Sequence, residues 1–168
     1  MTNLDTAIIY PGSCLFEGTE ISEGRGTTKP LEQFGAPYIN GKHWAEATQK
    51  EELDLQGAIL RPISFLPKFQ KHSAKTCHGV QLHITNRKTF KPFRWGMALI
   101  ASAYRLYNDD FKWRKQAFEF VDKIPAIDLL YGNSDFREAL EQNKSLASLE
   151  DKIIKYEKEY IDTILARV

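Results

Sequence analysis

The feature that most constrains the fold is a change of hydrophobic period at Pro92. Before it, segments 57–69 and 79–86 are rich in branched and aromatic residues, and apolar and polar positions alternate in the second. Such alternation is typical of half-buried strands. From Pro92 onward, segment 92–107 is apolar around most of its circumference, which indicates a largely buried helix. Strands first and helices later predict an α+β domain, with a small mixed or antiparallel sheet and a helical C-terminal part.

The other segments are assigned by the same criteria. Pro62 and Pro67 each lack a ladder donor, which places strand 57–69 at a sheet edge or a bulge. Ser134 is the expected N-cap of helix 134–143. We further expect strand, turn and strand over 6–18, a short helical turn and a packed loop over 29–41, and helices over 42–53, 112–124 and 145–168.

The last predicted helix carries a stripe of apolar side chains opposite a charged face. A helix of this kind normally packs its stripe on a core, so we expect these residues to be covered. The stripe consists of Leu149, Ile153, Tyr156, Tyr160, Ile161, Ile164 and Leu165.

Composition excludes several classes of function. With 168 residues, the chain can form one domain or one half of a larger two-part protein. The 23 Lys and Arg nearly balance the 22 Asp and Glu, so we expect no nucleic-acid partner. No apolar run is long enough for a membrane span, and the residues after Met1 predict no signal peptide. Cys14 and Cys77 fit one disulfide or two buried thiols, the latter being the simpler prediction.

A polar stretch, Glu17–Pro30, reads EGTEISEGRGTTKP and contains a single aliphatic residue, Ile21. It therefore cannot be a core element, and it is either a solvated loop or the lining of a polar pocket. A phosphate cradle is excluded because Gly24-Arg25-Gly26 does not match the P-loop pattern.

Metal binding, nucleophilic catalysis and glycoside hydrolysis each require a particular set of side chains. The histidines, His43, His72, His78 and His83, lack the spacing of a metal site, and neither cysteine is tied to a base. Glycoside hydrolysis needs two carboxyl groups about 5 or 9 Å apart, which Glu17 and Glu23 could supply. The alternative is that these carboxylates cap turns and pair with Arg25. Sugar binding would use the same side chains, because Glu, Arg, Ser and Thr form paired hydrogen bonds with ring hydroxyls.

Segments 10–41 and 61–100, including the sequence EGTEISEGRGTTKPLEQFGAP, together resemble the C-terminal half of a bacterial family long described as a domain of unknown function. Its characterised members are exo-β-N-acetylmuramidases, which remove terminal N-acetylmuramic acid from peptidoglycan fragments. The similarity runs from about Thr6 into the last helix.

The resemblance implies a two-part glycosidase, in which this chain, 1–168, is a single α+β domain. An N-terminal Rossmann-like domain, absent from this chain, holds the catalytic glutamates, and the C-terminal domain closes the other side of the cleft. Members are often exported to the periplasm or the extracellular space. The resemblance thus implies a muramyl sugar or peptidoglycan fragment and the N-terminal domain as partners, and no metal or cofactor.

The polar stretch is then the expected contribution of this domain to the cleft. Arg25 suits the lactyl carboxylate of muramic acid, because a guanidinium binds carboxylates in bidentate fashion. Within this chain, Glu17 and Glu23 are the candidates for a catalytic carboxylate, although the resemblance places the catalytic pair elsewhere. The expected substrate-binding residues are Glu17, Ser22, Glu23, Arg25, Thr27 and Thr28.

A domain that shares a cleft needs an interface with its partner, and we expect it near Pro37, Tyr38 and the strand that begins at Ile59. The alternative function is a stand-alone carbohydrate-binding or interaction module without catalytic activity.

Overall fold

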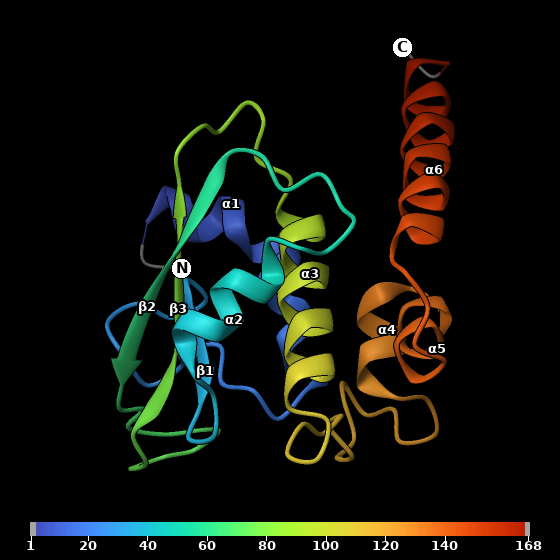
Figure 1. Ribbon diagram of the computed structural model, residues 1–168. Helices are drawn as coiled ribbons and strands as arrows, with labels where there is room; N and C mark the ends of the chain where they lie inside the picture. Colours follow the sequence, from blue (N-terminus) through green and yellow to red (C-terminus); the bar gives the residue numbers. More distant parts are fainter. Residues whose placement is uncertain (1–2, 167–168) are drawn as a thin grey trace.

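The computed structural model describes residues 3–166 and combines a small sheet with helices on one side of it (Figure 1). This arrangement confirms the predicted α+β class. No helix within these residues is long and apolar enough to cross a bilayer. The elements are α1 (Leu4–Ser13), the 3-10 helix η1 (Cys14–Gly18), β1 (Gln33–Ala36), α2 (Gly41–Thr48), β2 (Ala58–Phe65), β3 (Cys77–Ile84), α3 (Pro92–Leu106), α4 (Ala126–Tyr131), α5 (Asp135–Glu141) and α6 (Ala147–Leu165).

The sheet has three antiparallel strands in the order β1-β3-β2. Strand β2 is an edge strand, as Pro62 predicts, and it ends before Pro67. Leu60 lies opposite Leu82 and Arg61 opposite Gln81, so the two positions of each pair share a face. Leu82 belongs to the hydrophobic core, whereas Arg61 and Gln81 lie on the other face of the sheet. The largest buried side chains of the core are Trp44, Trp95, Phe16, Phe34 and Phe136.

Segment 6–18 is helical, which corrects the predicted strand, turn and strand. The side chain of Asn3 accepts a hydrogen bond from Thr6 N and caps α1, and Pro11 lies in its last turn. Gly12 packs against α3 so closely that a Cβ on Gly96 would lie 2.3 Å from Gly12 O. The Pro-Gly pair therefore marks a helix crossing, and not a turn between strands.

Segment 29–41 contains β1, where we predicted only a helical turn and a loop. Gly35 of β1 lies opposite Gly79 of β3, and a side chain on Gly79 would meet Phe34 O at 1.9 Å. Two facing glycines allow this close approach of backbones. The pairing partner is distant in sequence, so the local pattern did not indicate a strand.

Two predicted helices are confirmed with small changes. Helix α2 occupies the first part of segment 42–53, and Asn40 caps it by accepting from His43 N at 3.1 Å. Helix α5 begins after Ser134, whose side chain makes no cap hydrogen bond; the Oδ1 of Asn133 accepts from Asp135 N instead.

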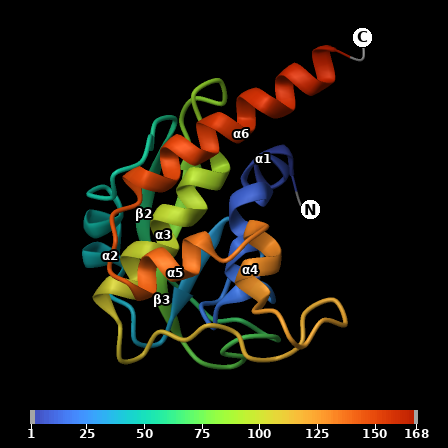
Figure 2. The same ribbon diagram turned by 90° about the vertical axis from the view of Figure 1, so that its right-hand side faces the viewer.

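The rest of the C-terminal part differs more from the predictions. Segment 112–124 is irregular rather than helical, and α4 was not predicted. Leu149 and Ile153 of α6 are buried, as expected. The later stripe residues are exposed, with Tyr160 at 68%, because the last turns of α6 extend beyond the rest of the molecule (Figure 2). The final two residues of predicted helix 145–168 lie outside the described residues.

Candidate functional site

The polar stretch Glu17–Pro30 leaves η1 and runs beside β1. Ser22 and Gly35 exchange backbone hydrogen bonds of 2.9 and 3.0 Å, so the stretch extends the sheet by one bridge. Gly24 and Gly26 have φ values of +74° and +79°, which L side chains rarely adopt. The stretch is therefore an ordered loop fixed to the sheet edge.

Glu23 belongs to a network of charged side chains that also contains Glu17, Arg25 and Lys71. The Glu23 carboxylate is buried, with its side chain 3% exposed, and Arg25 Nε lies 3.0 Å from its Oε1. Arg25 Nη2 also lies 2.5 Å from Glu17 Oε1. On the other side, Lys71 Nζ lies 2.8 Å from Glu23 Oε2. Arg25 therefore pairs with both carboxylates, which is the pairing that the sequence offered as the alternative to a catalytic role.

Lys71 is the residue of this network that the sequence reasoning missed. Its ammonium group also donates to Phe16 O at 2.8 Å and to Ile21 O at 3.1 Å, which ties the loop after β2 to the polar stretch. The neighbouring His72 donates from Nε2 to Glu20 O at 2.9 Å, and burial lowers the pKa of its imidazole. In the sequence, only the family resemblance, which includes segment 61–100, indicated that Lys71 and His72 could belong to the site.

The predicted binding residues divide into two groups by exposure. Ser22 is buried and accepts from Gly24 N at 3.1 Å, and Thr27 donates to Gly24 O at 2.6 Å, so both hydroxyls maintain the loop. Thr28 is exposed, Glu17 is half-buried, and the Arg25 side chain is 38% exposed. Glu23 is buried, and both of its oxygens face cations.

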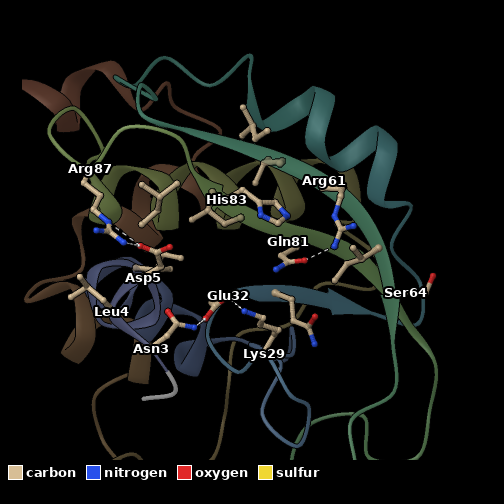
Figure 3. A pocket seen from close by; sticks show the side chains of 17 residues that line it. Asn3, Leu4, Asp5, Lys29, Glu32, Arg61, Ser64, Gln81, His83 and Arg87 are labelled. Carbon is tan, nitrogen blue, oxygen red and sulfur yellow. Dashed lines mark hydrogen bonds and ion pairs between the residues drawn. The ribbon is translucent and has the colours of Figure 1, made fainter.

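A groove of about 1270 Å³ lies on the open face of the sheet (Figure 3). It is bounded by the first turn of α1, segment 29–33, and strands β2 and β3. Lys29 is the one residue of the polar stretch in its lining. The polar positions of β3 that line it, Gln81 and His83, were predicted only to form a half-exposed strand face. The predicted site and this groove are therefore neighbouring but distinct.

Glu32 closes the end of the groove next to α1. Its carboxylate is buried, and it accepts hydrogen bonds from Asn3 Nδ2 at 2.7 Å and from the hydroxyl of Thr6. Lys29 Nζ lies 3.3 Å from the other carboxylate oxygen. These contacts fix the position of segment 29–33 relative to α1.

The residues predicted to lie at an interface differ in how exposed they are. Ile59 is 56% exposed and lines the groove, and Pro37 is exposed. Tyr38 is half-buried against Tyr107, with ring centroids 5.7 Å apart. Burial raises the pKa of the Tyr38 phenol above its usual range, and its hydroxyl has no hydrogen-bond partner among residues 3–166.

Cys14 and Cys77 are free thiols, Cys77 fully buried and Cys14 partly so. Burial raises the pKa of Cys77 to about 11, so its thiol is not activated. Within the described part of the chain, no group of three or more His, Cys, Asp or Glu side chains is placed to hold a metal ion.

The chain is similar to proteins of one family. Residues 8–166 match the family described as "Exo-beta-N-acetylmuramidase NamZ, C-terminal". The Peptidoglycan beta-N-acetylmuramidase NamZ of Bacillus subtilis (strain 168) is 39% identical over 158 residues. That match covers 94% of this chain and 35% of the relative, so the chain spans about a third of the relative's length.

Two crystal structures of DUF1343 family proteins from Bacteroides fragilis NCTC 9343 have a similar fold. The first superposes with a TM-score of 0.70 at 24% identity, covering 86% of this chain and 37% of the other. The second has a TM-score of 0.58 at 25% identity, covering 89% and 36%. The family match over nearly the whole chain shows that the chain belongs to the NamZ family of exo-β-N-acetylmuramidases, as its C-terminal domain.

Proposed function

We propose that this domain forms one wall of the substrate cleft of an exo-acting β-N-acetylmuramidase. In this proposal, the part of the relatives that the chain does not match is the N-terminal Rossmann-like domain, which supplies the catalytic carboxylates. The substrate is a peptidoglycan fragment that ends in N-acetylmuramic acid. The proposal rests on the family membership and on the geometry of the polar stretch.

The observation that carries the proposal is the position of Arg25. Its guanidinium is held between Glu17 and Glu23, and Glu23 is itself fixed by Lys71. The side chain nevertheless remains 38% exposed, so a ligand can reach it. A cation whose orientation is fixed before binding loses little conformational entropy when a carboxylate arrives. Arg25 is therefore suited to the lactyl carboxylate of muramic acid.

The other predicted residues take two different roles in this proposal. Glu17, which pairs with Arg25 and is partly exposed, and Thr28, which is exposed, can hydrogen-bond with sugar hydroxyls. Ser22, Glu23 and Thr27 hold the loop in shape, since their polar atoms already have partners within it. Glu23 is thus a positioning residue, and neither Glu17 nor Glu23 is required as the catalytic acid.

A chimera tests the proposal. This chain replaces the matching part of the Bacillus subtilis relative, and release of N-acetylmuramic acid from a chromogenic N-acetylmuramide is measured. We expect an active chimera in which Arg25→Gln lowers kcat/KM by about tenfold to a hundredfold, the usual size for a lost charge-assisted hydrogen bond. Arg25→Lys should restore part of the loss.

The exposed Lys155→Gln substitution, on α6, is the matched control for charge and should leave kcat/KM unchanged. An active chimera that is indifferent to Arg25→Gln would contradict the proposed role of the polar stretch. If the chain instead binds muramyl sugars and no chimera is active, the stand-alone binding module becomes the better explanation.

A further inference from the structure

The groove on the open sheet face contains one cation that differs from the others in its lining. Lys29 pairs with Glu32, and Arg87 Nη2 lies 2.7 Å from Asp5 Oδ1. Arg61 has no carboxylate partner among residues 3–166; its Nη2 donates to Gln81 Oε1 at 2.7 Å. An amide oxygen orients the guanidinium but leaves its charge uncompensated. The groove therefore presents one oriented and available positive charge.

The surroundings of Arg61 combine polar and apolar groups. Ile59 and Ile63 lie on the same face of β2 as Arg61, and Ile59 is 56% exposed. His83 is the cross-strand partner of Ile59, and its Nε2 is buried without a hydrogen-bond partner within the described residues. Figure 3 shows the His83 ring close to Gln81 and Arg61 on the groove side of the sheet. Such a mixture suits a ligand with an acidic group next to a short apolar body.

We propose that this groove is a second ligand site, which binds an organic carboxylate through Arg61. The carboxylate accepts from the guanidinium that Gln81 orients, and the apolar body of the ligand lies on Ile59 and Ile63. This inference rests on the proposed function for the identity of the ligand. A muramic acid residue without a peptide carries its carboxylate on the lactyl group, whereas one with a peptide has that carboxyl converted to an amide and carries its carboxylate on the peptide. The groove would hold one of these carboxylates away from Arg25.

The groove and the polar stretch are separate enough to be tested independently. Arg25 does not line the groove, and among the described residues no ion pair joins Arg61 to Glu17 or Glu23. Loss of ligand binding at Arg61 therefore reports on the groove, whereas loss of chimera activity at Arg25 reports on the proposed cleft.

The test measures binding of three probes to this chain by calorimetry and by backbone amide chemical shifts. The probes are N-acetylmuramic acid, muramyl dipeptide and N-acetylglucosamine, which lacks the carboxylate. We expect one or both acidic probes to bind and to shift amides of β2 and β3, and the neutral sugar not to bind. The tighter of the acidic probes identifies the lactyl or the peptide carboxylate as the source.

Variants decide where the acidic probes bind. Arg61→Gln should raise Kd about tenfold or more, and Arg61→Lys should raise it less. Arg87→Gln should change Kd less than twofold, because Arg87 lies at the opposite end of the groove from Arg61, where it pairs with Asp5 (Figure 3). The inference is overturned if no acidic probe binds, or if binding ignores Arg61→Gln. It is also overturned if that variant only weakens association with the rest of the enzyme, which would make the groove a domain interface.

Discussion

Lys71 Nζ and Glu23 Oε2 lie 2.8 Å apart although 48 positions separate the two residues in sequence. This contact joins the loop after β2 to the polar stretch and fixes the carboxylate that in turn holds Arg25. The orientation of the proposed substrate-binding arginine therefore depends on a lysine in another segment of the chain.

Replacing Lys71 with Met should destabilise the domain. The change leaves the buried Glu23 with Arg25 as its remaining cation and frees two backbone carbonyls, so we expect a loss of about 2 kcal/mol in the free energy of unfolding. Urea denaturation measures it. Lys68→Met, at an exposed position of the same loop, is the control and should cost less than about 0.5 kcal/mol. Equal effects of the two variants would contradict the network.

The crossing of α1 and α3 should not tolerate a methyl group. We expect Gly96→Ala to cost about 2 to 3 kcal/mol, because its Cβ would overlap backbone atoms of Gly12 that cannot move independently. Gly132→Ala is the comparison: its Cβ meets open space, and only its φ of +100° opposes the change, at about 1 kcal/mol. Thermal or urea unfolding that ranks Gly132→Ala as the worse change would refute the close crossing.

The end of α6 should be dispensable for folding of this domain. A chain that stops after Lys158 keeps Glu150 and Glu157, whose carboxylates pair with the buried Arg94 at 2.6 and 2.8 Å. Of the residues removed, 159–166 are exposed, so we expect a change in stability below about 1 kcal/mol. Replacing Arg94 with Met should cost more, because it removes the cation shared by both glutamates. A truncated chain that fails to fold would show that the projecting turns are needed.

Neither thiol should react readily in the folded protein. Burial raises the pKa of Cys77 to about 11, and burial together with Glu17 raises the pKa of Cys14. A raised pKa leaves little thiolate at pH 8, so iodoacetamide should label Cys77 ~100-fold more slowly than in urea. Cys14, which is only partly buried, should be labelled first. Mass spectrometry that finds a disulfide, or equal labelling rates with and without urea, would oppose this expectation.

The sequence predicted those elements whose patterns are local. The alternation in segment 79–86 and the apolar surface of 92–107 correspond to β3 and α3. Burial on one side, or on all sides, of an element determines which of its positions are apolar, so the pattern can be read from the sequence. The Pro11-Gly12 pair misled the prediction because its glycine is needed for contact with Gly96, which lies far along the chain. Such contacts have no local signature.

The same distinction applies to the candidate site. The density of polar groups in Glu17–Pro30 singled this stretch out and allowed for pairing of its carboxylates with Arg25, but it left open whether the stretch was a solvated loop or lined a pocket. It did not reveal Lys71, nor the groove around Arg61, because both depend on how distant strands and loops meet. The stripe of α6 was correctly periodic, but periodicity alone does not say where the underlying core ends.

The most direct test of the account is hydrolysis of a chromogenic N-acetylmuramide by this chain alone and after addition of the remaining, separately produced part of the Bacillus subtilis relative. Each piece alone should give no turnover above the protein-free control, and the mixture should release the chromophore at a rate that saturates with the second piece. The Arg25→Gln variant should reduce that rate. Turnover by this chain alone that is abolished by Glu23→Gln would contradict the account and place the catalytic carboxylate in the polar stretch itself.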